Sequence, residues 1–266
     1  MWKSFGFYLL CDPQIMIRIS VAILTFNEER NIRRCIDSVQ AVADEIVVVD
    51  SYSSDATISI CESMGVKVVQ NAFGGYIEQK NFAITCCANQ HILSLDADEA
   101  LSEELIESIK QVKDNWTADG YSMNRLTNYC GSWIYHSGWY PDRKLRLFDR
   151  NKASWGGVNP HDKLEMVVGS VTEQLRGDLL HYSYYSVEEH KAQVAKFADI
   201  AALAMHKKGS RSDVLKVIYK PIARFMRSYI VKAGFLDGKN GLIIAMQTAR
   251  GSFLRYSKLL KLQKNK

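Results

Sequence analysis

Four short apolar segments alternate with three segments of helical periodicity between residues 17 and 95, and this alternation limits the fold more than any other feature. Residues 45–50 read Glu-Ile-Val-Val-Val-Asp, which is too apolar for a strand with one face in water and is typical of a parallel sheet covered on both faces. Strands that alternate with helices of about ten residues imply right-handed crossovers between parallel neighbours. We therefore expect a doubly wound α/β sheet, with strands at residues 17–26, 45–50, 66–69 and 91–95.

Local signals predict where the helices begin. Asn27 precedes Glu28 and Glu29, and this order is typical of a helix N-terminus, because an Asn side chain caps free amides and carboxylates favour the positive end. Apolar residues spaced three and four apart then form one stripe: Ile32, Cys35, Ile36 and Val39. Further helices are expected after the polar turn at residues 50–55 and over residues 76–87.

The pattern changes beyond Ser102. One more helix follows, and then a two-residue alternation that is typical of antiparallel strands appears at Tyr121, Met123, Leu145 and Leu147. From Val187 onward the periodicity is helical again. These changes divide the chain into residues 17–101, residues 102–186 and a helical extension of residues 187–266.

Residues 91–99 read His-Ile-Leu-Ser-Leu-Asp-Ala-Asp-Glu, so an expected strand ends in the acids Asp96, Asp98 and Glu99. Carboxylates packed this closely repel one another unless a cation lies among them. In open α/β sheets the ligand crevice lies at the carboxyl ends of the strands. The cluster therefore indicates a site for a divalent metal and its phosphate ligand.

The formal charge of +5 is divided unevenly along the chain. Residues 207–266 hold 15 Lys and Arg against two acids, a net of +13, whereas the remainder holds 19 basic and 27 acidic residues, a net of −8. An acidic body with a basic amphipathic tail fits attachment to an anionic membrane surface better than it fits nucleic acid, which we exclude as a partner. Basic helices that simply pack on the body are the alternative.

The six cysteines form no Cys-x-x-Cys pair, which favours a reducing compartment. The first 15 residues lack a signal-peptide pattern, and the sequence leaves open whether Met1 or Met16 starts the protein. We expect a cytoplasmic protein, peripheral at the inner face of the cytoplasmic membrane.

Five blocks, taken together and in order, resemble the inverting family 2 glycosyltransferases with the GT-A fold, and among them the lipopolysaccharide-core sugar transferases of bacteria. The blocks lie at residues 23–29, 48–57, 79–81, 95–99 and 144–148. The resemblance implies a Rossmann-like mixed sheet, mainly parallel in its N-terminal half, with residues 17–101 binding the nucleotide-sugar and residues 102–186 the acceptor. It also implies metal-dependent transfer of a hexose from a UDP-sugar to a glycolipid.

The same resemblance assigns roles to individual residues. Asp98 would bind the Mg²⁺ or Mn²⁺ ion, with Asp96 nearer the ribose and the metal shell. The remaining nucleotide-sugar contacts would come from Thr25, Glu28, Asp50, Lys80 and Asn81. Arg146 would meet phosphate or an anionic group of the acceptor. His181 is either a structural histidine or a further metal ligand.

An inverting transfer needs a carboxylate that accepts the proton of the attacking hydroxyl group. Asp162 is the leading candidate, since relatives carry an acidic pair or a His-acid pair at about this distance, and His161 precedes it. Asp142, Glu165 and His161 itself remain alternatives.

Two other functions stay open at this point. Transfer to a polyprenyl phosphate would use Arg146 and the basic tail equally well. A sugar-nucleotide binding module without catalysis would keep the donor site alone.

Overall fold

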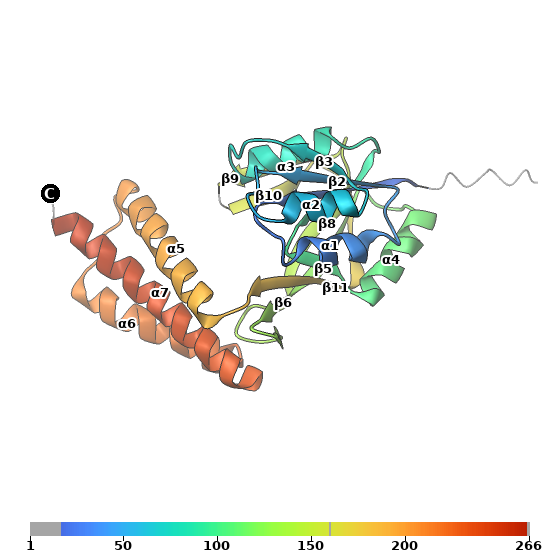
Figure 1. Cartoon of the computed structure of the whole chain (residues 1–266). Coiled ribbons are helices and arrows are strands. Elements are labelled where there is room, and N and C mark those ends of the chain that lie inside the picture. The colour runs from blue at the N-terminus through green and yellow to red at the C-terminus, as the bar shows by residue number, and fades with distance from the viewer. Residues whose placement is uncertain (1–16, 160, 265–266) are drawn as a thin grey trace, which may run out of the picture.

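A computed structural model describes residues 17–159 and 161–264 (Figure 1). The choice between Met1 and Met16 lies outside the described residues. The described part forms a nine-stranded mixed sheet in the order β3-β2-β1-β4-β8-β6-β11-β5, with β7 paired to β6, and a two-stranded sheet of β9 and β10. The α/β architecture with a mainly parallel N-terminal half is thus confirmed.

The first half alternates strands and helices as expected. Its elements are β1 (Ile19–Thr25), α1 (Ile32–Val39), β2 (Glu45–Asp50), α2 (Thr57–Ser63), β3 (Lys67–Gln70), α3 (Tyr76–Thr85) and β4 (His91–Asp96). β1 pairs in parallel with both β2 and β4, and the register sets Thr25 beside Asp50 and Leu24 beside Asp96. The carboxyl ends of three strands therefore meet at one edge. Because neighbouring strands lie about 4.8 Å apart, the backbones of Asp50 and Asp96 are roughly 10 Å from each other.

The second half inserts antiparallel strands next to β4. Its elements are β5 (Glu99–Leu101), α4 (Glu103–Asp114), β6 (Gly120–Tyr129), β7 (Ser132–Ile134), β8 (Asp142–Asp149), β9 (Ala153–Val158), β10 (His161–Met166) and β11 (Thr172–Tyr184). β8 runs antiparallel to both β4 and β6. Tyr121, Met123 and Leu147 are fully buried, so the alternation in the sequence marked the core face of these strands. β8 thereby joins the two halves.

The start predicted for the first helix is wrong. α1 begins at Ile32, and Asn27 lies in a left-handed turn with φ of 56°. Its side-chain oxygen accepts a hydrogen bond from the backbone N–H of Ser54 at 2.8 Å instead of capping the helix. The residues between β1 and α1 consequently form a loop at the edge where the strands end.

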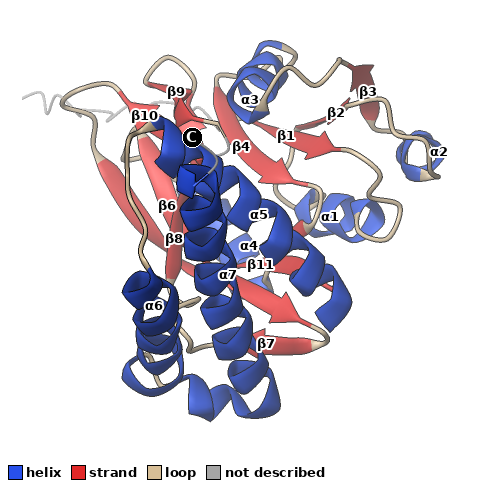
Figure 2. Cartoon of the chain, turned by 90° about the vertical axis from the view of Figure 1, so that its left-hand side faces the viewer, coloured by secondary structure: helices blue, strands red, loops and turns tan. Residues whose placement is uncertain are grey.

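Three C-terminal helices stand beside the sheet as a separate layer (Figures 1 and 2). The extension consists of α5 (Val187–Lys207), α6 (Val214–Met226), a π-helical turn η1 (Arg227–Val231), a 3-10 turn η2 (Gly234–Asp237) and α7 (Gly238–Lys264). α7 packs against both α5 and α6, and Ser186 with Glu189 forms a capping box at the start of α5. None of the described helices has the length and apolar content of a membrane span.

A small aromatic core joins the extension to the sheet. Buried Tyr129 and Ile134 from the sheet pack with Ile244 from α7. His190 of α5 lies against the Tyr129 ring, and its Nδ1 is 3.0 Å from the Tyr129 hydroxyl. Burial lowers the pKa of His190 to about 4, because desolvation disfavours the charged imidazole. The junction therefore holds a neutral histidine.

This histidine predicts an acid-sensitive junction. Between its ordinary pKa of 6.5 and about 4, the unfolded chain binds a proton at His190 that the folded chain does not, so stability falls as the pH falls through this window. The difference amounts to about 3 kcal/mol at most. In His190→Gln, the side chain retains hydrogen-bonding capacity but does not titrate. The free energy of unfolding, measured with urea, should therefore fall less between pH 7 and pH 4.5 than in the wild type. His206→Gln, on the same helix, is the control, and equal acid dependence in all three proteins would refute the prediction.

Candidate active site

The acid at the end of β4 is held by two cations. One Asp96 oxygen lies 3.4 Å from Lys80 Nζ of α3, and the other lies 3.0 Å from Arg146 Nη2 of β8. Burial alone would raise the pKa of Asp96, but Lys80 and Arg146 outweigh it and hold the pKa well below its usual value. Asp96 is therefore a fixed carboxylate at neutral pH.

The pairing continues through the sheet as an alternating chain of charges. Arg146 Nη2 lies 2.8 Å from Glu99, whose same oxygen is 3.4 Å from Arg125 of β6. Arg125 in turn lies 2.7 Å from Asp142, which also pairs with Lys144 at 3.1 Å. Burial would raise the pKa of Asp142, but Arg125 and Lys144 lower it overall. Four acids and four bases alternate in what we call the ion-pair chain: Asp162, Lys80, Asp96, Arg146, Glu99, Arg125, Asp142 and Lys144.

Asp162 forms the other end of this chain. Its carboxylate lies 2.8 Å from Lys80 Nζ, which also stands 4.3 Å from the centre of the Trp155 ring. The Asn81 side chain donates to the Trp155 carbonyl at 2.9 Å and accepts from the Trp155 N–H at 3.0 Å. Both polar groups of Asn81 thus fasten β9 to α3, while Lys80 reaches the site. The backbone of His161 pairs with Val158, and its side chain lies outside the description.

Asp98 stands outside the ion-pair chain. Among the described residues its one ion-pair partner is His181 of β11, with Nε2 at 3.2 Å from the carboxylate. The other ring nitrogen of His181 lies 2.7 Å from the Ser183 hydroxyl. Burial raises the pKa of nearby Glu28, and the carboxylates of Asp98, Asp55 and Asp96 raise it further. This part of the site therefore carries unbalanced negative charge.

Thr25 and Asp50 occupy the neighbouring strand ends. The Thr25 hydroxyl is buried and has no hydrogen-bond partner. An unpaired buried hydroxyl destabilises the fold unless a ligand forms a hydrogen bond with it. Asp50 is fully buried and accepts a hydrogen bond from the Ser53 N–H at 2.9 Å. An open, polar cavity of about 380 Å³ lies nearby, and its lining includes Glu28, Asp55 and Asp98.

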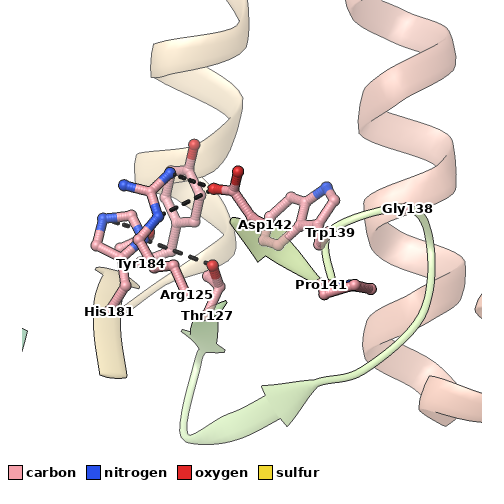
Figure 3. Close-up of a pocket in the computed structure, with 9 residues that line it drawn as sticks. Arg125, Thr127, Gly138, Trp139, Pro141, Asp142, His181 and Tyr184 are labelled. Atoms are coloured by element: carbon pink, nitrogen blue, oxygen red, sulfur yellow. Dashed lines mark hydrogen bonds and ion pairs between the residues drawn. The ribbon is translucent and has the colours of Figure 1, made fainter. Parts of the chain in front are cut away.

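A second cavity, of about 330 Å³, has His181 in its wall (Figure 3). Asp142 and Arg125 pair directly with one another in its lining, and Trp139 presents its ring beside Asp142. His181 and Ser183 belong to its wall, and Ser183 also lines the first cavity. Because Asp98 lines the first cavity and His181 the second, their contact links the two cavities. An aromatic face beside a carboxylate is a suitable surface for a sugar ring.

The structure brings most of the expected residues to this edge, gives Glu99 of the acid cluster a supporting role, and adds Arg125, which the sequence analysis missed. Glu99 is 1% exposed and anchors two arginines, so it supports the site from within and is not a free ligand. Arg125 links Glu99 to Asp142. Its position in the sequence could have indicated this role, because Arg125 continues the two-residue alternation of the buried Tyr121 and Met123. Glu165 pairs with Lys163 at 2.9 Å on the two-stranded sheet, and both side chains are exposed.

Comparisons with known proteins identify the family of this chain. The model of the family described as "Glycosyl transferase family 2" matches residues 20–167. An uncharacterized glycosyltransferase of Rickettsia bellii (strain RML369-C) is 32% identical over 259 residues, covering 92% of this chain and 87% of that protein. The lipopolysaccharide core biosynthesis glycosyltransferase LpsC of Rhizobium meliloti (strain 1021) is 28% identical over 249 residues and covers 91% of each chain.

Solved structures are more distant. The crystal structure of S. aureus TarS is 16% identical with a TM-score of 0.45, and the match covers 82% of this chain but 45% of that one. The chain thus spans less than half of that protein. The family model and a relative of similar length show that the chain belongs to glycosyl transferase family 2 and is a glycosyltransferase.

Proposed function

We propose that the protein transfers a hexose, with inversion, from a UDP-sugar to a glycolipid of the lipopolysaccharide-core type, with the help of a divalent cation. The observation that carries the proposal is the isolation of Asp98. Its neighbours Asp96 and Glu99 are neutralised by the ion-pair chain, whereas the one ion-pair partner of Asp98 among the described residues is His181. The name of the relative LpsC supports the choice of acceptor class.

Asp98 and His181 fit a transition-metal or magnesium site in part. A carboxylate and an imidazole are suitable ligands for Mn²⁺, and Mg²⁺ accepts one or two carboxylates with waters and substrate phosphates. No cluster of three His, Cys, Asp or Glu side chains arranged for one ion exists among the described residues, so phosphate and water oxygens would complete the shell. When bound, the ion would offset the charge that develops on the departing diphosphate.

The chain's own residues would hold the donor on either side of Asp98. Thr25, with its unpartnered hydroxyl, and Asp50 lie at adjacent strand ends, and Glu28 lines the open cavity of about 380 Å³; we assign the nucleoside to this edge. Lys80 and Arg146 supply positive charge beside Asp96, and Lys80 can meet a diphosphate by exchanging one of its two carboxylate partners. We leave Asn81 out of the donor contacts because its amide is occupied by Trp155.

For the catalytic base we favour Asp142 over Asp162. Asp142 lines the cavity beside Trp139, and 35% of its side chain is exposed, whereas 14% of the Asp162 side chain is exposed and Lys80 covers it. In this assignment the Asp142 carboxylate takes the proton of the acceptor hydroxyl group. At the same time the hydroxyl oxygen bonds to the anomeric carbon of the donor sugar, and the bond from that carbon to the diphosphate breaks. Its lowered pKa keeps it ionised at neutral pH. Asp162 then serves to position Lys80.

The acceptor's lipid places the enzyme at a membrane. Every residue of α6 lies at least partly in contact with solvent, and its apolar side chains form an exposed stripe at Leu215, Ile218, Ile222 and Met226. The same helix carries Lys216, Lys220 and Arg224 outside the stripe. Such a helix suits a position within the interface of an anionic bilayer. We propose that α6 holds the protein at the cytoplasmic membrane surface.

Removal of the Asp98 carboxylate should abolish metal-dependent turnover. For Asp98→Ala we expect the Mn²⁺-stimulated release of UDP from a UDP-hexose to fall by at least about 100-fold, since a group that stabilises developing charge is typically worth that much. Screening UDP-hexoses for UDP release in the absence of acceptor identifies the donor at the same time. Asp37→Ala removes an exposed acid of α1 and should change nothing. Full metal-dependent activity in Asp98→Ala would exclude this residue from the site.

The two candidate bases predict different kinetic changes. Asp142→Asn should lower kcat for transfer by about 10²- to 10⁴-fold and leave UDP affinity close to that of the wild type. Asp162→Asn should chiefly raise the KM for the donor, because Lys80 loses a partner that orients it. Steady-state kinetics with isothermal titration of UDP separates these effects. The reverse pattern would return the role of base to Asp162.

Membrane docking predicts binding to anionic vesicles that weakens with salt. The paired substitutions Ile218→Ser and Ile222→Ser on α6 should reduce co-sedimentation with phosphatidylglycerol vesicles by at least about tenfold, because two aliphatic groups leave the bilayer. Ile200→Ser and Leu203→Ser on α5 remove similarly exposed residues and should have little effect. Equal loss in both pairs, or no binding by the wild type, would contradict the proposed face.

A further inference from the structure

The loop between β7 and β8 carries much of the acceptor-side cavity. It contributes Gly138, Trp139 and Pro141 to the lining and leads directly into Asp142 (Figure 3). Two of its residues have left-handed backbones, with φ of 61° at Ser137 and 81° at Gly138. A non-glycine residue in that conformation persists only when surrounding contacts determine it. The source of those contacts therefore decides where Trp139 and Asp142 lie.

One carboxylate of the C-terminal extension holds the start of this loop. Asp237, at the end of η2, accepts hydrogen bonds from the backbone N–H groups of Tyr135 at 3.2 Å and His136 at 3.1 Å. It also lies 2.9 Å from His136 Nδ1 and accepts from the Ser137 hydroxyl at 3.3 Å. Its side chain is 4% exposed. Hydrogen bonds to a buried, ionised acceptor are among the stronger ones in proteins.

The extension also forms hydrogen bonds with the backbone of the next residue of the loop, Ser137. The N–H of Ser137 donates to the Lys232 carbonyl at 2.9 Å, and the Ser137 carbonyl accepts from the Ser228 hydroxyl at 3.2 Å. Gly234 lies so close that an added Cβ would stand 2.7 Å from the Ser137 hydroxyl. Both backbone polar groups of Ser137 are thus satisfied by the extension.

The Trp139 ring is packed from the same side. Its centre lies 5.8 Å from the His190 ring of α5 and 5.8 Å from the Tyr129 ring of the sheet. The extension consequently fixes both the backbone before Trp139 and one side of its ring.

We propose that the C-terminal extension is a structural part of the acceptor site, and that Asp237 is a positioning residue that sets the β7–β8 loop so that Trp139 and Asp142 face the acceptor. This inference rests on the proposed function, because it assigns the Asp142 cavity to the acceptor. It gives the extension a second role, separate from membrane docking. Donor binding at Asp98 and Asp50 does not depend on this loop.

The decisive variant is Asp237→Asn, with Asp213→Asn as its matched control. Asp213 is the other acid of residues 207–266, and it too accepts a backbone hydrogen bond, from Lys216 N–H at 2.8 Å, but it caps α6 away from the loop. With the UDP-hexose that the UDP-release screen identifies and micelles of truncated-core lipopolysaccharide, Asp237→Asn should lower kcat/KM for the acceptor at least 30-fold. Its UDP affinity and its UDP release without acceptor should match the wild type. Asp213→Asn should leave all these quantities unchanged.

A readout independent of turnover tests the same inference. Hydrogen exchange at residues 135–142 should accelerate at least tenfold in Asp237→Asn and remain as in the wild type in Asp213→Asn. Ser137→Ala removes one hydrogen bond to Asp237 and should give a smaller acceleration of hydrogen exchange in the same segment. It replaces Asp237→Asn in the test if that variant does not fold. Unchanged loop exchange in a folded variant overturns the inference. A wild type that releases UDP but does not modify the glycolipid refutes the proposed acceptor instead, and the exchange data still decide the role of Asp237.

Discussion

The pairing of the Arg146 guanidinium with Asp96 and Glu99 is the interaction on which the site depends. Arg146 is 3% exposed and keeps its proton in any folded state, so its burial requires carboxylates close by. Those carboxylates come from the end of β4 and the start of β5, whereas Arg146 lies on β8. The pair therefore joins the parallel half of the sheet to the antiparallel half at the edge to which we assign the active site.

Neutralisation within the ion-pair chain also explains how one acid stays available. With four acids and four bases, the chain balances its own charge, and it leaves Asp98 next to His181 in a region where carboxylates already raise the pKa of Glu28. A divalent cation would relieve that repulsion, and in the proposed function Lys80 would meet the diphosphate by exchanging one of its two carboxylate partners. The same buried charges that join the halves thus prepare the edge for a cation and an anionic ligand.

The sequence predicted the parts of this site that depend on local order. Strand periodicity located the acids at the end of β4 and Asp50 at the end of β2, since parallel strands end at one edge. It misplaced the start of α1, because the Asn27 side chain does not cap that helix and instead accepts a hydrogen bond from the Ser54 N–H. The partners of Glu99 could not be predicted, since Arg125 and Arg146 reach it from strands far along the chain. Pairing between such strands follows from the packing of the whole sheet.

In the proposed function, donor and acceptor recognition rest on different parts of this chain. The donor side is built from the ends of three strands in one continuous sheet, whose positions are fixed by backbone pairing. The acceptor side is built from a loop whose conformation depends on Asp237 and on η1, the turn that directly follows α6. A change in the extension can therefore alter which acceptor is accepted without disturbing the donor site. Because the proposed membrane-docking helix and the loop contacts are adjacent in the chain, a lipid-linked acceptor would arrive beside the residues that position its sugar.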